Sequence, residues 1–334
     1  MLKIQRNRNV RFWQSPGGLL CFVMIVLLFG CGPRSQQAAR KQSNKRSDAS
    51  IAISGAFALY PLTVKWAEEF RQLHPDVRID ISAGGAGKGM ADALSGTVDL
   101  GMFSRAILPA EKEQGVWWIA VTKDAVLATM SAQNPAVDEL KTKGLTKQQF
   151  MNLFLHAQQQ SWGSLVGSPI RQHVTVYTRS DACGAAGTWA AFFGASQEDL
   201  AGVGVFGDPG LADAVRKDPC GIGYNNTIYI YNPKTDRKYE GLEVVPMDLN
   251  GNRRIDPDED FYDTMSDVMA AITSGKYPSP PARDLYFVAK GRPQNAAVRA
   301  FLEWILDEGQ QYVRLAGYVA LNPEVIRNQK AKLE

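Results

Sequence analysis

The stretch Tyr177–Trp189, YTRSDACGAAGTW, decides the fold. It follows an alternating run, Val174–Tyr177, that predicts a strand, and it precedes Trp189–Gly194, whose spacing is typical of a short helix. A turn of small residues that opens a helix leaves backbone N–H groups unpaired at the positive end of the helix dipole, where anions bind. Arg179 adds a charged fork that Asp181 can orient. The alternative is an ordinary loop with a surface ion pair.

The same strand-to-helix pattern occurs earlier in the chain. The predicted strands are 51–55, 77–82 and 98–102, and the predicted helices are 60–71 and 90–94. The turn 83–89 is rich in glycine, and the third strand is followed by Ser104-Arg105. Alternating strands and helices predict a parallel α/β unit, and the ligands of such sheets collect at the carboxyl ends of the strands.

Large aromatic side chains occur at helical or strand spacing. We expect Trp66, Trp189, Tyr224 and Trp304 in the core and not at a ligand. The apolar stripe formed by Val298, Phe301, Leu302 and Ile305 predicts a packing helix.

The charge of the chain is distributed unevenly. Its 334 residues suit two domains, or one two-lobed domain behind a signal. Residues 1–49 hold nine of the 37 Lys and Arg residues and one of the 34 Asp and Glu residues, so the other 285 residues carry 28 basic and 33 acidic side chains. A net-acidic body argues against nucleic-acid binding. Any anion site must therefore be a local cationic pocket.

Residues 1–30 resemble the signal peptide of a bacterial lipoprotein. Four basic residues and no acid precede residue 19, and the apolar run Leu19–Phe29 is too short for a comfortable membrane span. Cleavage of such a signal leaves a lipidated cysteine at the new N-terminus, here Cys31, and the polar residues 31–49 are expected to form a flexible tether. This predicts an exported protein anchored to a bacterial membrane, in the periplasm or at the cell surface. The alternative is a signal anchor or a plain signal peptide with an incidental Cys31.

Two cysteines remain in the body once Cys21 and Cys31 are assigned to the signal. In an exported protein Cys183 and Cys220 are expected to form a disulfide. The alternative, a nucleophilic thiol, needs a nearby base, and none of the three histidines lies in a recognisable partner motif.

Several patches of the body match one family in order. They are Gly84-Gly-Ala-Gly87, Gly96-Thr-Val-Asp-Leu-Gly101, Leu145–Phe154, Arg179-Ser-Asp181, Gly221-Ile-Gly-Tyr224 and Ala297–Leu321. From Ile51 to Pro323 the chain resembles the phosphate-binding proteins of ABC transporters, which belong to the two-lobed periplasmic-type substrate-binding proteins.

The resemblance implies an α/β fold of the type II periplasmic binding protein class, with a hinge between two lobes. Lobe 1 would take residues 50–120 and 285–334, lobe 2 would take residues 121–284, and the chain would cross at 117–122 and 284–289. A monomer would bind a small oxyanion, with phosphate favoured, in the cleft and deliver it to an ABC permease. No enzyme activity, required cofactor or nucleic acid is implied.

At the cleft the resemblance carries over only in part. Arg179 matches the ligand arginine of the family, Asp181 the carboxylate that steadies it, and Gly187-Thr188 the donors at the helix start. The other predicted ligand positions depart from the pattern: Phe57-Ala58 stands where a threonine usually donates, Ala86 or Gly87 and then Lys88 replace a serine, Ala186 replaces another serine, and Ser104-Arg105 replaces Ser-Asp. The loop Asp181–Ala186 is also three residues longer than usual.

The change at Arg105 bears on the choice of anion. A carboxylate at this position accepts a hydrogen bond from protonated phosphate and repels fully ionised sulfate, whereas an arginine only donates. Three side-chain hydroxyls are also absent, each worth on the order of 1 kcal/mol or more to a bound anion. We expect backbone N–H groups, Arg105, Arg179 and Lys88 to hold the anion instead. The alternative for Arg105 and Lys88 is a solvated surface charge.

A second candidate site is the loop 248–259. Its oxygen-bearing side chains at positions 1, 3, 5, 9 and 12 resemble the spacing of an EF-hand calcium loop: Asp248, Asn250, Asn252, Asp256 and Glu259. Position 6 is Arg253 in place of the usual glycine. The pattern predicts either a structural Ca²⁺ or a polar surface turn, followed by a helix from Asp260 to Thr273.

Two functions other than transport make different demands on the sequence. A hydrolase would need a nucleophile beside a base, or a metal with an open coordination position, and the body offers neither pattern. A sensor or scaffold with a degenerate cleft is kept open by the missing hydroxyls. The sequence therefore predicts an oxyanion receptor, ahead of a sensor and of an enzyme.

Overall fold

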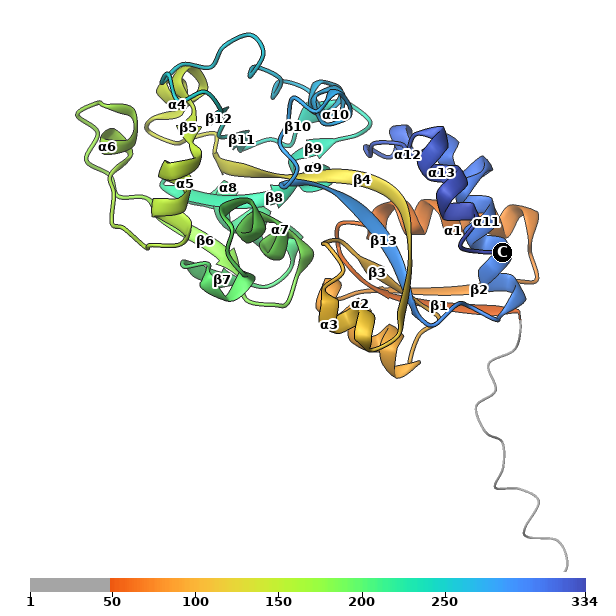
Figure 1. Cartoon of the computed structure of the whole chain (residues 1–334). Coiled ribbons are helices and arrows are strands. Elements are labelled where there is room, and N and C mark those ends of the chain that lie inside the picture. Colours follow the sequence, from red (N-terminus) through yellow and green to blue (C-terminus); the bar gives the residue numbers. More distant parts are fainter. Residues whose placement is uncertain (1–48) are drawn as a thin grey trace, which may run out of the picture. The chain divides into compact units, whose positions relative to one another are not determined.

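The computed structural model of the protein describes residues 49–334 (Figure 1). Residues 49–334 lie within one compact unit. The predicted signal peptide, the lipidation site Cys31 and the tether up to residue 48 lie outside the described residues. Among the described helices, none combines the length and the apolar character needed to cross a membrane.

A mixed sheet forms the centre of this unit. Its strands lie in the order β2 (Arg78–Ala83), β1 (Ser50–Gly55), β3 (Leu100–Phe103), β13 (Ala282–Lys290), β4 (Val116–Ser131), β8 (Gly221–Asn226), β6 (Thr175–Arg179) and β7 (Val203–Val205), with β11 (Leu242–Val244) paired to β4. β1 is parallel to β2 and β3, and β6 is parallel to β7 and β8. β13 and β4 run antiparallel to their neighbours. The three predicted N-terminal strands are therefore confirmed.

Helices cover both faces of the sheet. The longer ones are α1 (Tyr60–Leu73), α2 (Ala86–Ser95), α5 (Lys147–Phe154), α7 (Gly184–Phe193), α8 (Asp208–Lys217), α10 (Met265–Ser274), α11 (Ala296–Leu306) and α13 (Pro323–Lys330). The shorter ones are α3 (Pro109–Glu113), α4 (Val137–Lys143), α6 (Trp162–Val166), α9 (Thr227–Ile230) and α12 (Gln311–Leu315). Two small sheets pair β5 (Leu145–Thr146) with β12 (Met247–Asp248) and β9 (Tyr231–Asn232) with β10 (Arg237–Lys238).

Helix α2 lies directly on the sheet because glycines let the backbones touch. A Cβ atom at Gly55 would overlap the carbonyl oxygen of Met102, and one at Gly101 would overlap that of Gly89. Side chains at these positions would push α2 away from β1 and β3. The N-terminus of α2 is therefore held firmly at the carboxyl ends of these strands.

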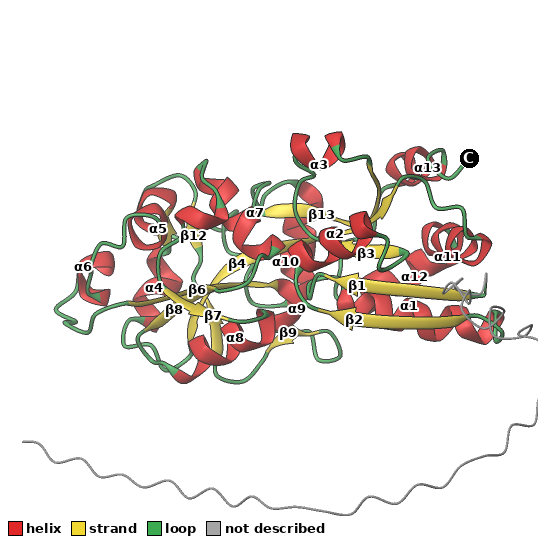
Figure 2. Ribbon diagram, turned by 90° about the horizontal axis from the view of Figure 1, so that it is seen from below, coloured by secondary structure: helices red, strands yellow, loops and turns green. Residues whose placement is uncertain are grey.

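Helices α1, α11 and α12 form a layer beside β1 and β2 (Figure 2). Trp66 of α1 is fully buried and donates its indole N–H to the carbonyl oxygen of Gly309 at 2.8 Å. Phe70 packs edge-on against Phe301 and Trp304 of α11, with ring centroids 5.1 and 5.7 Å apart. The predicted core positions of Trp66 and Trp304 are confirmed.

A second aromatic cluster fixes α7 against β8 and α5. The ring of Trp189 lies 5.2 to 6.0 Å from those of Phe150, Phe154, Phe193 and Tyr224. Trp189 and Tyr224 are both fully buried, as predicted. Helix α7 begins five residues before the predicted start at Trp189 because the small residues Gly184–Thr188 join it.

Strands β4 and β13 run through the middle of the sheet without a break. β4 pairs with β13 through residues 116–125 and with β8 through residues 126–130. A bulge shifts the β4–β13 register between Leu285 and Tyr286. The predicted lobe boundaries, 120/121 and 284/285, fall at this bulge and remain a prediction.

Candidate anion-binding cleft

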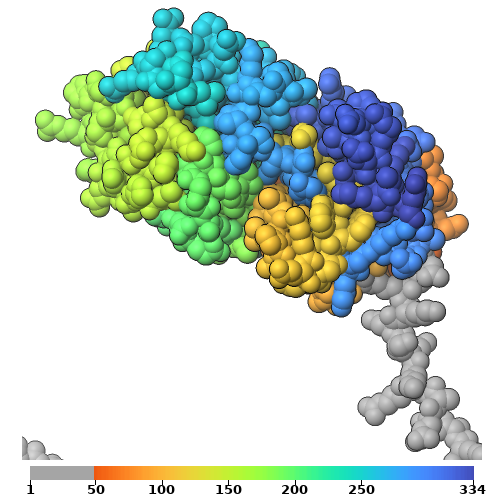
Figure 3. Space-filling model, viewed as in Figure 1, coloured from red at the N-terminus to blue at the C-terminus, as the bar shows by residue number. Residues whose placement is uncertain are grey.

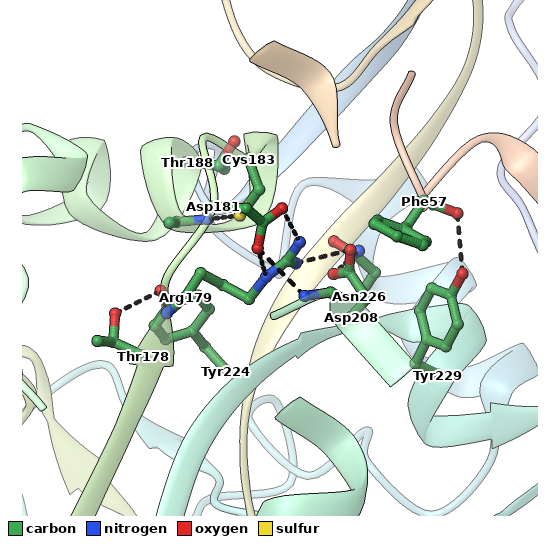
Figure 4. Close-up of polar contacts among 12 residues, drawn as sticks. Phe57, Thr178, Arg179, Asp181, Cys183, Thr188, Asp208, Tyr224, Asn226 and Tyr229 are labelled. Atoms are coloured by element: carbon green, nitrogen blue, oxygen red, sulfur yellow. Dashed lines mark hydrogen bonds and ion pairs between the residues drawn. The ribbon is translucent and has the colours of Figure 1, made fainter. Parts of the chain in front are cut away.

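Arg179, the predicted ligand arginine, lies at the carboxyl end of β6 and has a fully buried side chain. Its Nε and Nη2 donate to the two carboxylate oxygens of Asp181 at 2.8 and 2.6 Å (Figure 4). This bidentate pair fixes the plane of the guanidinium, as the predicted orienting role of Asp181 requires.

The other side of Arg179 is also occupied. Its Nη1 forms an ion pair with Oδ2 of Asp208 at 2.7 Å. The N–H bonds of Nη1 do not point at this oxygen well enough to make a hydrogen bond. Asp208 is 3% exposed and accepts a 2.5 Å hydrogen bond from Asn226. The ring of Phe57 covers the guanidinium with its centroid 5.8 Å away (Figure 4). Burial opposes the charge, but Asp208 and Asp181 outweigh it and raise the pKa of Arg179, so the guanidinium stays charged. The chain itself supplies the anions around Arg179.

The long loop 181–186 fills the start of α2. The carbonyl oxygen of Ala182 accepts a 3.0 Å hydrogen bond from the N–H of Gly87, in the first turn of the helix. Gly85 has φ +89°, and a Cβ there would lie 2.9 Å from both that oxygen and Oδ2 of Asp181. The positive end of α2 therefore points at a backbone carbonyl and a carboxylate of the same chain. In Figure 3 the gold surface around α2 and α3 meets the green surface of α7.

The loop also changes the start of α7. Cys183 caps the helix, and its Sγ accepts a 3.3 Å hydrogen bond from the N–H of Ala186. The N–H of Gly187 is donated to the carbonyl oxygen of Cys183 at 3.2 Å. Because the helix begins at Gly184, Gly187 lies one turn inside it, so the hydroxyl of Thr188 is the remaining free donor of the predicted pair. Gly187 lies close to Arg105, since a Cβ at position 187 would be 3.1 Å from Cδ of that arginine.

A cavity of about 580 Å³ opens beside these residues. It lies between the β3–α3 loop and α2 on one side and α7 on the other, with β13 behind it. Of the predicted ligand residues it brings together Gly87, Arg105, Gly187 and Thr188. Arg283, Lys123 and Tyr286 of the crossing strands also line it.

Two arginines with fixed partners face this cavity. Arg105 donates to both carboxylate oxygens of Glu111, at 3.1 and 2.7 Å. Arg283 is 8% exposed and donates from Nε and Nη2 to Asp124 at 2.8 and 3.2 Å. Arg283 also donates from Nη1 to Oγ1 of Thr188 at 3.1 Å, which leaves the hydroxyl hydrogen of Thr188 free to point at an anion.

Sequence reasoning missed Arg283, Asp124 and Asp208. A signal for the first two was present, since both are charged residues inside strands that are mostly apolar. Asp208 had no local signal, because its partner Arg179 lies 29 positions earlier in the sequence.

The remaining predicted ligand residues do not line the cavity. Ala58, Ala86 and Ser104 are buried, at 2%, 1% and 2% exposure. The side chain of Lys88 forms an ion pair with Asp92, one turn further along α2. Ser104 packs so closely against α7 that a Cβ at Gly184 would overlap both of its oxygens.

The predicted disulfide between Cys183 and Cys220 is wrong: both thiols are free. Cys220 precedes Gly221, which pairs with Thr175 at the amino end of β6, whereas Cys183 follows the carboxyl end of that strand. Four residue steps of about 3.3 Å separate these ends by about 13 Å, well beyond the Cα–Cα limit of about 7 Å for a disulfide. Burial, partly offset by Arg179, raises the pKa of the Cys183 thiol to about 12, so it stays protonated.

The loop 248–259 is held together by its own hydrogen bonds. The carboxylate of Asp248 accepts from the N–H groups of Gly251, Asn252 and Arg253 at 2.7 to 3.2 Å, and that of Glu259 accepts from three further backbone N–H groups. The amides of Asn250 and Asn252 donate to Asp256 at 2.9 and 2.8 Å. Across residues 49–334, no group of three or more His, Cys, Asp or Glu side chains is arranged to hold a metal. The predicted helix after the loop is α10, which begins at Met265.

Comparisons with known proteins match this chain to one superfamily. The model of the PBP superfamily domain matches residues 35–308. The phosphate-binding protein PstS of Methanocaldococcus jannaschii is 25% identical over 93% of this chain and 92% of its own length. The protein of the same name from Pseudomonas aeruginosa is 26% identical over 91% of this chain and 95% of its own length.

Solved structures show the same fold. A protein from Clostridium perfringens, solved with bound phosphate, superposes with a TM-score of 0.65 at 22% identity, covering 82% of this chain and all of the other. An ABC-type phosphate transport receptor from Vibrio cholerae gives a TM-score of 0.60 at 16% identity, covering 81% of this chain and all of the other. The predicted α/β fold class is confirmed. Because the family model spans most of its length, the chain belongs to the PBP superfamily.

Proposed function

We propose that the protein is an extracytoplasmic receptor that captures a small oxyanion, with phosphate favoured, and delivers it to an ABC permease. The observation that carries this proposal is the cavity of about 580 Å³ between α2, the β3–α3 loop and α7. Arg105 approaches it from one side and Thr188 from the other, and Arg283 lies behind Thr188. The relatives named as phosphate-binding proteins support phosphate as the anion.

Binding would act through closure of the predicted lobes. Arg105 belongs to predicted lobe 1 and Thr188 to predicted lobe 2, so only the closed form brings both sets of donors to one anion. A ligand that prefers the closed form shifts the population toward it. The bulge at Leu285/Tyr286 is the proposed hinge, since a register shift weakens the ladder locally. No proton transfer or covalent step is required.

The remaining parts of the proposal come from the sequence. We propose a monomer that is anchored by a lipid on Cys31, needs no cofactor and binds no nucleic acid. A thiol-dependent hydrolase would need a reactive thiolate, and the buried, protonated Cys183 offers none. The proposed activity is therefore binding.

One observation favours a second function, that of a sensor or scaffold with a degenerate cleft. Arg179 is closed off by Asp181, Asp208 and Phe57. If no anion binds in the cavity, the protein would act through its outer surface, as a sensor or scaffold.

Isothermal titration of residues 50–334 with phosphate, sulfate, molybdate and arsenate at pH 6 and 8 tests the receptor proposal. We expect phosphate to bind, and Thr188→Val to weaken it about tenfold, because one hydrogen bond to an anion is lost. The matched control Thr273→Val, on the exposed face of α10, should leave the affinity unchanged.

Two other outcomes have definite meanings. Equal binding of sulfate means that the site recognises charge and not a proton, as the presence of Arg105 suggests. If none of the four oxyanions binds, the receptor proposal fails and the sensor takes its place.

A structural Ca²⁺ in the loop 248–259 also stays a proposal. Its support is the set of oxygen side chains and the φ of +63° at Arg253, a conformation that glycine usually supplies at this position of a calcium loop. We expect millimolar Ca²⁺, and not Mg²⁺, to raise the melting temperature, and Asp256→Asn to reduce that rise. If Ca²⁺ does not change the melting temperature, the loop is a polar turn and not a calcium site.

A further inference from the structure

We propose that the ligand of this cavity is an organic phosphate, in which a phosphoryl group is joined to a small uncharged body. The inference rests on the proposed receptor function and names the class of molecule that the site would take. Three independent observations carry it: the size of the cavity, the presence of both polar and apolar side chains in its lining, and the closure of Arg179.

The cavity is larger than an inorganic oxyanion alone would fill. Its volume of about 580 Å³ lies within the range of about 300–1,000 Å³ that is typical of sites for organic ligands. A tetrahedral oxyanion has only five heavy atoms and would leave most of this space filled with solvent.

The polar part of the lining can hold a phosphoryl head. A guanidinium has five N–H donors, and Arg283 uses four of them on Asp124, Asn226 and Thr188. One Nη1 hydrogen of Arg283 and the hydroxyl hydrogen of Thr188 remain. Arg105 uses three donors on Glu111 and the carbonyl oxygen of Ala106, which leaves two more. These groups come from three different elements and are held in place by buried or half-buried carboxylates.

The apolar part of the lining gives an organic body something to bind. Leu108, Ala191, Ala195, Pro280 and the ring of Tyr286 contribute to it. Inorganic phosphate gains nothing from such a surface, whereas an organic body that covers it removes apolar area from water and binds more tightly.

The chain has also closed the place where a bare oxyanion would meet Arg179. Asp181 and Asp208 contact its guanidinium, Phe57 covers it, and the Ala182 carbonyl occupies the first turn of α2. Releasing Arg179 would leave these two carboxylates buried without a counter-charge. Donors that remain at the cavity include those of Arg105, Arg283 and Thr188, and apolar side chains share the same lining.

Titration calorimetry of residues 46–334, which form one compact unit, tests this inference with inorganic phosphate, glycerol 3-phosphate and phenyl phosphate, and with glycerol and phenol as uncharged controls. We expect at least one ester to bind ten times more tightly than inorganic phosphate, and neither alcohol to bind. Ala191→Trp, which places a large ring at the apolar wall from an exposed position on α7, should reduce the preference for the ester at least fivefold. Ala296→Trp, at the exposed start of α11 and away from the cavity, should keep the wild-type preference.

The outcomes separate this inference from the proposed function. If inorganic phosphate binds at least as tightly as both esters, or if Ala191→Trp leaves the preference unchanged, the inference is overturned while the receptor function stands. If no phosphate compound binds, the receptor function fails and this inference fails with it.

Discussion

Replacement of Arg179 by methionine is expected to lower the free energy of unfolding by about 3–5 kcal/mol. The guanidinium is fully buried and contacts Asp181 and Asp208, so its loss leaves two buried carboxylates without a counter-charge. Urea denaturation of residues 50–334 measures the change. A ligand arginine in an open cleft would give the opposite pattern, with little loss of stability and a large loss of anion affinity.

Two further variants make this test specific. Adding Asp208→Asn to Arg179→Met removes one of the stranded charges and should restore about 1 kcal/mol or more of the lost stability, since residues in contact are energetically coupled. Arg216→Met removes an exposed arginine that pairs with Asp213 on α8, and it should cost less than about 0.5 kcal/mol. If Arg179→Met lowers the free energy of unfolding no more than Arg216→Met does, Arg179 is not the essential counter-charge of Asp181 and Asp208.

Substitution of Gly184 by alanine is expected to separate the two sides of the cleft. The added methyl group would overlap Oγ and the carbonyl oxygen of Ser104, and the backbone of Ser104 cannot move aside as a flexible side chain could. We expect a loss of about 1–3 kcal/mol in the free energy of unfolding, which is typical of overpacking. The radius of gyration, measured by small-angle scattering, should increase because α7 moves away from the β3–α3 loop.

The matched control is Gly210→Ala, in the first turn of α8. A Cβ there meets only a methyl group of Val205, at 3.2 Å, so the better helix propensity of alanine should make this change neutral or slightly stabilising. A Gly184→Ala protein with unchanged stability and scattering would mean that α7 and Ser104 are not in firm contact in solution.

Much of the fold could be predicted from the sequence because the signals were local. Residues 51–102 alternate between strand and helix patterns, and the structure contains the parallel unit that these patterns predict. Arg179 and Asp181 are two residues apart, so their pairing needed only the end of one strand. Trp66 and Trp189 were recognised as core by their spacing alone.

The parts that could not be predicted depend on contacts between distant segments. Asp208 reaches Arg179 only because α8 begins beside the end of β6, and nothing near either residue indicates this. The disulfide prediction failed because Cys183 and Cys220 lie at opposite ends of β6, which a count of cysteines does not reveal. The extra length of the loop 181–186 was visible in the sequence, but its direction into the start of α2 was not.

The hydrogen bond from Gly87 to the carbonyl oxygen of Ala182 has a consequence for how this cleft can change during evolution. Both partners are main-chain atoms, so most single substitutions at position 182 would leave the hydrogen bond in place. Deletions within 182–184 would withdraw the carbonyl and free the start of α2. In related proteins, insertions and deletions in this loop should therefore decide whether the start of α2 is blocked or free. The identity of any single residue in the loop should matter less.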